Sequence, residues 1–139
     1  MHAILNRIRR GALLAEALAA LVLSSALIAL FPFRRVAAMA AKGRKDARPA
    51  SASRAFDIGW AVAGWGRRVP WHAMCFQQGL AAQMMLRRRC LASALYYGAR
   101  REVDGVLVAH IWVRSAHVDV IGCEGSEAYG LLAVFSAAD

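Results

Sequence analysis

The longest apolar stretch of the chain lies near its N-terminus. From Gly11 to Phe33 the only charged residue is Glu16, and the stretch reaches the ~20 residues that a bilayer span requires. Arginines flank it on both sides. Three interpretations fit this pattern: a buried or partner-docking helix bent at Ser24 and Ser25, a membrane-associated helix, or a signal sequence. The length of the apolar run and the absence of a small-residue cleavage site disfavour export.

A basic and then small, polar segment follows at residues 42–54, and its composition is typical of a linker or an exposed loop. It predicts a boundary near residue 50. Residues 1–50 would form an N-terminal helical segment with a basic linker, and residues 51–139 would form the main domain. Within that domain, Ile58, Val62 and Trp65 recur at helical spacing and predict a short helix over residues 56–66.

The second half of the chain changes from helical to strand character. The sequence CFQQGLAAQMMLRRR, from Cys75 to Arg89, favours a helix whose basic last turn suits the helix dipole. After Cys90, β-branched and aromatic segments alternate with Gly, Asp and Ser, which predicts three or four mainly antiparallel strands at residues 91–98, 106–114, 118–121 and 129–135. Helices followed by such strands predict an α+β fold.

Composition and charge narrow the class of protein. A chain of 139 residues fits one domain with a modest core, and 59% hydrophobic residues is high for a soluble protein. The net charge of +9 attracts acidic partners, whether nucleic acid, anionic membrane or acidic peptide. The cysteines, at positions 75, 90 and 123, form neither a disulfide framework nor a paired zinc motif, so we expect free thiols in the cytoplasm and no cofactor.

Cys75 is the first candidate for chemistry. It follows Pro70-Trp71 and falls at the start of a predicted helix. The positive end of the helix dipole and the unpaired N–H groups there favour the thiolate, the form that attacks carbonyls, and the same groups can stabilise an oxyanion. A buried structural cysteine fits the position about as well.

His110 is the second candidate, on an apolar predicted strand where a histidine without function is the commoner case. A two-residue turn at Ser115-Ala116 would pair Trp112 with Asp119 and place His110 and Asp119 diagonally, roughly 7–8 Å apart. A carboxylate there can hold the imidazole toward a thiol. A three-residue turn would put Asp119 on the other face. The geometry therefore predicts a Cys75–His110–Asp119 set.

Other residues compete for these roles. His72 precedes the Cys75 helix without a carboxylate partner, His117 falls at the predicted turn, and Glu124 is an alternative to Asp119. Further candidates are glutamines for an oxyanion contact and two cysteines that we interpret as structural or incidental: Gln77, Gln78, Gln83, Cys90 and Cys123.

The arginine run 87–89 ends the Cys75 helix. Its simplest interpretation is a favourable helix C-terminus, and the functional one is docking of an acidic partner. Because aromatic residues are not interleaved with the basic ones, we expect no nucleic-acid binding.

From about Trp60 to Phe135 the sequence resembles the lasso-peptide biosynthesis B2 proteins, which belong to the transglutaminase-like superfamily. The stretches that carry this resemblance are RRVPWHAMCFQQGLAAQMMLRRR, LYYGA, AHIWVRSAHVDVIGCEG and YGLLAVF. It implies a papain/transglutaminase-like fold in which the Cys75 helix packs on a small sheet, with Cys75 as nucleophile, His110 as base and Asp119 as the acidic residue. The chain departs from the family pattern at Arg114, which replaces an acid, at Cys90, where glycine is usual, and at His72, where a basic residue is common.

The resemblance also implies a reaction and partners. A cysteine peptidase would remove the leader of a precursor peptide, with a separate leader-binding B1 (RRE) protein, before an asparagine-synthetase-like cyclase forms the macrolactam. An acyl transferase or amidase using the same residues is the first alternative. The second is a membrane-attached basic adaptor that contacts the bilayer through residues 11–33.

Overall fold

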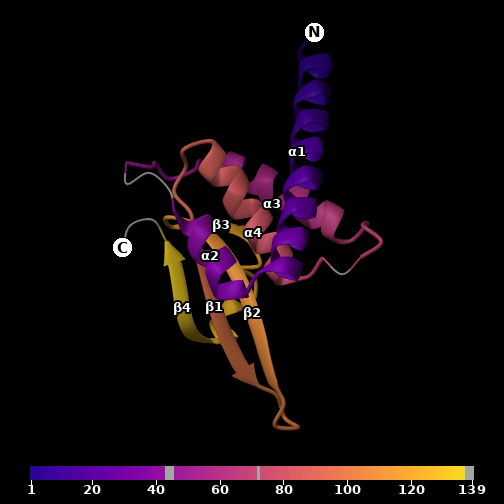
Figure 1. Ribbon diagram of the computed structural model, residues 1–139. Helices are drawn as coiled ribbons and strands as arrows, with labels where there is room; N and C mark the ends of the chain where they lie inside the picture. The colour runs from indigo at the N-terminus through magenta and orange to yellow at the C-terminus, as the bar shows by residue number, and fades with distance from the viewer. Residues whose placement is uncertain (43–45, 72, 137–139) are drawn as a thin grey trace.

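The computed structural model describes residues 1–42, 46–71 and 73–136. Four helices come first, α1 (His2–Leu30), α2 (Phe33–Ala41), α3 (Ala52–Gly66) and α4 (Cys75–Arg88). Four strands follow, β1 (Ala94–Arg101), β2 (Leu107–Ser115), β3 (Val118–Ile121) and β4 (Gly130–Ser136), with a short 3₁₀ helix η1 (Ser126–Ala128) before the last. The strands form one antiparallel sheet in the order β3-β2-β1-β4, with the helices grouped against it (Figure 1). The predicted α+β fold is confirmed.

The N-terminal apolar stretch forms one continuous helix. The helix runs without interruption through Ser24 and Ser25, whose hydroxyls donate to the carbonyls of Ala20 and Leu21 at 2.7 and 2.8 Å. The second half of α1 packs into the core through Ala17 and Leu21. All of residues 1–12 are exposed, and this end of α1 stands clear of the body (Figure 1). Among the described residues, α1 is the one helix long and apolar enough to cross a membrane, by length and composition.

The boundary predicted near residue 50 lies in the loop between α2 and α3. Residues on both sides of it belong to the same hydrophobic core: Leu21 and Val36 before it, Ile58 and Leu80 after it. The backbone also ties this loop to the main domain, since Ala92 N–H donates to the carbonyl of Arg48 at 2.7 Å. Helix α3 is then capped by Ser51, whose hydroxyl accepts a hydrogen bond from the Arg54 N–H.

The three arginines at positions 87–89, at the end of α4, bind to groups on α1 and α2. Arg89 donates two hydrogen bonds to the carboxylate of Glu16, at 2.7 and 2.5 Å, and Arg88 lies 3.3 Å from the same group. Arg87 donates to the carbonyl of Met39 in α2 at 2.8 Å. All three arginines thus have structural partners on other helices in addition to their favourable place at a helix C-terminus.

Acidification should weaken the contact between α1 and α4. The Arg89 hydrogen bonds lower the pKa of Glu16 from its usual 4.5, although burial opposes them. Because the folded pKa is the lower one, the stability that Glu16 adds is complete above about pH 4.5 and is lost as the pH falls through the folded pKa. We expect Glu16→Gln to cost about 1 kcal/mol at neutral pH, since the pair is partly open to water, and to flatten this pH dependence. Urea unfolding at neutral and acidic pH measures both effects.

Glu102→Gln is the matched control for that experiment. Glu102 pairs with Arg100 at 2.8 Å, but both side chains are well exposed. An exposed pair contributes little, so this variant should unfold as the wild type does at either pH. Equal pH profiles for Glu16→Gln and the wild type would contradict the structural role of Glu16.

The β2–β3 hairpin differs from its predicted register. The turn is Ala116-His117, and Ser115 is the last residue of β2. The hydroxyl of Ser115 is buried and accepts a hydrogen bond from the N–H of Ala50 at 2.8 Å. Ser115 therefore pairs with Val118, and Arg114 pairs with Asp119. A bulge follows, since the next pair joins Val113 to Ile121 and leaves Val120 without an opposite residue. The prediction that Trp112 pairs with Asp119 is wrong.

The end of α4 gives a physical reason for the glycine usual at position 90 in the family that the sequence resembles. Cys90 has a φ of 55°, in the left-handed region that favours glycine. Its N–H donates to the carbonyl of Arg87, and the N–H of Leu91 donates to Leu86, both at 3.0 Å. These two bonds form the Schellman motif, in which the residue after the helix adopts this conformation.

Candidate active site

Cys75 is the first residue of α4 and has a free, partly buried thiol. Met74, before it, has no side-chain oxygen to cap the first turn, and the capping bond comes instead from the Gln77 side chain, which accepts from the Met74 N–H. The N–H groups at the start of α4 are therefore available to an anion near the thiol. Gln78 fixes the approach to the helix, since its side-chain amide donates to the carbonyl of Ala73 at 2.7 Å.

The side of α4 that carries Cys75 lies against the sheet. Gly79, one turn later, lies so close to β2 that a Cβ on it would meet a methyl of Ile111 at 2.8 Å and one of Val113 at 3.6 Å. Phe76 packs beside Tyr97 of β1 and Phe33 of α2, with the two phenylalanine rings 4.8 Å apart. The thiol thus borders an apolar wall formed by α2, α4 and β1.

His110 lies on the other face of the sheet. Its neighbour Ile111 contacts α4, and side chains alternate along a strand, so the imidazole points away from that helix. The ring packs with two aromatic rings in a cluster of three, with centroids 6.0 Å from Trp112 and 5.0 Å from Tyr129. Its Nε2 is 2.8 Å from the carbonyl oxygen of Gly122. Because a carbonyl only accepts, Nε2 carries the hydrogen in this contact and Nδ1 is left as the acceptor.

The structure does not bring Cys75 and His110 together: within the described residues no hydrogen bond joins them. The ring of His110 nevertheless lies at an open margin of the sheet. The pairing of β2 with β3 ends at Val113, and the carbonyl of Gly122, in the segment after β3, contacts the imidazole. The imidazole therefore lies on the face opposite α4, beside a part of β2 that β3 leaves unpaired.

Asp119 is not a partner of His110. Its carboxylate lies 3.0 Å from Nε of Arg114, as an ion pair on a well-exposed side chain. Arg114 is four residues from His110, about 13 Å along the strand. Glu124 is exposed, and no contact with His110 is found for it within the described chain. The group that faces His110 is the carbonyl of Gly122, which the sequence marked only as a break after β3.

The remaining candidates have structural roles or lie outside the described residues. Gln77 accepts from the N–H of Met74 at 3.1 Å, and buried Gln83 donates to the carbonyl of Phe135 at 3.3 Å. Cys123 is half-buried, and burial raises the pKa of its thiol, which favours the unreactive protonated form. His117 is exposed at the turn, and His72 lies outside the described residues.

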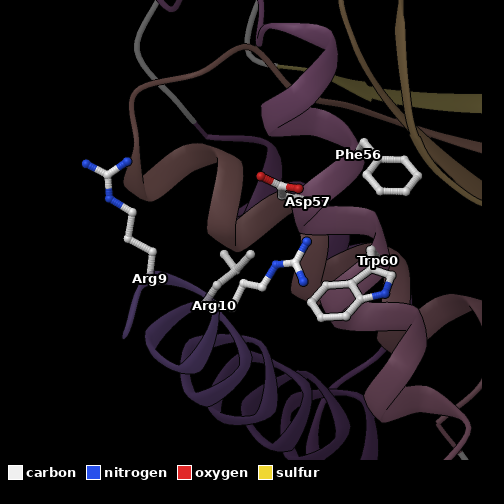
Figure 2. A pocket seen from close by; sticks show the side chains of 6 residues that line it. Arg9, Arg10, Phe56, Asp57 and Trp60 are labelled. Carbon is white, nitrogen blue, oxygen red and sulfur yellow. The ribbon is translucent and has the colours of Figure 1, made fainter. Parts of the chain in front are cut away.

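A groove runs between α1 and α3 on another side of the molecule. Arg9 and Arg10 of α1 and Phe56, Asp57 and Trp60 of α3 line a cavity of about 190 Å³, in which Arg10 extends toward Trp60 (Figure 2). The guanidinium of Arg10 lies 5.6 Å from the Trp60 ring, close enough for a cation–π contact. The sequence analysis missed this groove. The spacing of Phe56 and Trp60 by one helical turn, out of phase with buried Ile58 and Val62, is the signal that would have indicated it.

The chain has an α+β fold in which a helix that starts with a cysteine packs on an antiparallel sheet. Comparison with known families identifies the superfamily. A model of the transglutaminase-like superfamily matches residues 17–133, and the chain belongs to this superfamily. Its members are often cysteine peptidases or acyltransferases. The match includes the second half of α1, all of α2, α3 and α4, and all but the end of the sheet. No curated protein and no solved structure matches the chain.

Proposed function

We propose that the protein is a cysteine peptidase that removes the leader from a lasso-peptide precursor, with Cys75 as nucleophile. The observation that carries this proposal is the free, partly buried thiol of Cys75 at the first turn of α4. Membership of a superfamily rich in cysteine-dependent enzymes supports it. The identity of the substrate rests on the resemblance of residues 60–135 to the B2 proteins.

The reaction would proceed through an acyl-enzyme. The Cys75 thiolate attacks the carbonyl at the junction of leader and core, and the N–H groups at the start of α4 stabilise the oxyanion. An imidazolium, assigned to His110, protonates the leaving amine as the C–N bond breaks. Water then attacks the thioester, the imidazole accepts its proton, and the leader carboxylate leaves. The freed core amine is the group that a separate cyclase would join to a side-chain carboxylate.

Proximity of base and thiol is a requirement of this mechanism. In the structure described above, the His110 ring rests on the outer face of the sheet. His110 acts as base only if β2 turns locally, so that the ring leaves its contacts with Trp112 and Tyr129 and reaches the face that packs on α4. Binding of an extended peptide beside the unpaired part of β2 would favour this movement.

Cleavage of a precursor peptide tests the proposal. Purified protein, with its leader-binding partner, should convert the precursor to leader and core. In mass spectrometry the masses of the two fragments should add up to the mass of the precursor plus one water. Cys75→Ala should lower the rate by about 10³-fold or more, because no other described thiol starts a helix. Cys90→Ala, which removes an exposed thiol, should cleave normally. Full activity of Cys75→Ala would refute the proposal, and a shifted mass without cleavage would identify acyl transfer instead.

A further inference from the structure

Helix α1 has an apolar face that no described element covers. At the free end Met1, Ile4, Leu5 and Ile8 are all exposed. The same side of the helix continues toward its C-terminus, opposite buried Ala17. From residue 11 to residue 31 every exposed residue is glycine or apolar: Gly11, Ala12, Ala15, Ala19, Val22, Leu23, Ala26, Ala29, Leu30 and Phe31. We call these exposed residues, with Met1, Ile4, Leu5 and Ile8, the α1 face. A helix of 29 residues is about 43 Å long, so the face extends well beyond an ordinary surface patch.

Positive charge borders both ends of the α1 face. Arg7 and Arg9 lie beside the exposed apolar residues of the first turns, and Arg34 and Arg35 follow the helix; all four are exposed. The acidic residue of α1, Glu16, is paired with Arg88 and Arg89 and leaves no exposed negative charge on the helix. The chain as a whole carries a net charge of +9. The face is thus an apolar strip with cationic borders.

We infer that the α1 face docks on the surface of an anionic lipid bilayer, with the helix lying in the plane of the interface. Helices that bind in this way combine an apolar face with arginine or lysine beside it. Anionic lipid headgroups complement the charge of the four arginines. A bilayer can bury a long apolar strip, and the strip has no exposed polar group that would select a particular protein partner. The inference does not depend on the proposed peptidase activity.

The packing of α1 favours an interfacial orientation over a transmembrane one. Ala17, Leu21 and Ser24 are fully buried against the rest of the domain. The indole N–H of Trp65 in α3 donates to the carbonyl of Leu14 at 2.8 Å. A spanning helix would have to break these contacts and the Glu16 ion pairs. A helix lying on the surface keeps all of them, and its free N-terminal end extends the contact beyond the body of the molecule (Figure 1).

Vesicle flotation tests the inference with the full chain. The wild type should float with phosphatidylcholine–phosphatidylglycerol vesicles and remain largely in solution with phosphatidylcholine alone or at high salt. A triple variant Ile4→Gln, Ile8→Gln and Leu23→Gln should bind the anionic vesicles about tenfold more weakly. The replaced side chains are 64%, 62% and 52% exposed, so the folded state should tolerate the change.

The matched control replaces equally exposed apolar residues away from α1. Val103→Gln, Val106→Gln and Leu131→Gln alter side chains that are 107%, 56% and 55% exposed, on the β1–β2 loop and β4. This variant should bind vesicles as the wild type does. Absence of binding to anionic vesicles, or equal binding by the two triple variants, would overturn the inference. So would a wild-type dimer that the α1 variant abolishes, because the face would then be covered by a second copy.

Discussion

Replacing Gly59 with alanine is expected to lower the free energy of unfolding by about 3 kcal/mol. A Cβ on Gly59 would lie 2.0 Å from the carbonyl oxygen of Val120 and 3.1 Å from its carbonyl carbon. Both atoms belong to the backbone of β3, which cannot rotate away as a side chain can. Either α3 must withdraw from the sheet or the bulge at Val120 must shift, and both changes would open the core around Ile58 and Val62.

Gly11→Ala is the control for this change. Gly11 lies in the exposed part of α1, where a Cβ would meet no atom within 4 Å. Alanine is the better helix former, so this variant should gain up to about 1 kcal/mol. Urea unfolding followed by circular dichroism measures both variants. Wild-type stability in Gly59→Ala would mean that α3 and β3 do not approach as closely as the structure indicates.

Much of this fold follows from local patterns in the sequence. The helix predicted at residues 75–89 and the strand predicted at residues 118–121 match α4 and β3 because helical propensity and β-branched runs are properties of short segments. The hairpin register does not follow from such patterns. It depends on a long-range bond from Ala50 to Ser115 and on a bulge at Val120, and the turn residue Ala116 has a φ of 53° without being glycine.

The sequence predicted that Cys75 starts a helix, but it did not predict which groups lie near the candidate site residues. That it starts a helix is readable from the residues on either side. Which face of the sheet carries His110, and what occupies the position opposite it, depend on the strand that packs on α4 and on the path of the chain after β3. Likewise, the apolar run from Gly11 was evident from composition, but the start of α1 at His2 and the contrast between its buried side and the exposed α1 face appear only in the packed molecule.

Loss of the imidazole at position 110 is expected to lower precursor cleavage by about 10³-fold in His110→Ala, because proton transfer to the leaving amine is needed for the C–N bond to break. His72→Ala should keep at least about half of the activity if His72 only precedes the helix. A large loss in His72→Ala with normal activity in His110→Ala would transfer the role of base to His72, three residues before the nucleophile.

The structure and the sequence prediction differ in the group that contacts the imidazole of His110. Asp119 pairs with Arg114, and the carbonyl of Gly122 holds Nε2 of His110. Asp119→Asn should therefore change the cleavage rate by less than about threefold, whereas loss of a true triad carboxylate costs about 10⁴-fold. A loss near that size would show that the hairpin changes register when the peptide binds, so that Asp119 reaches the imidazole. Unchanged cleavage in Asp119→Asn, together with inactive His110→Ala, would leave His110 as the base and exclude Asp119 as its orienting group.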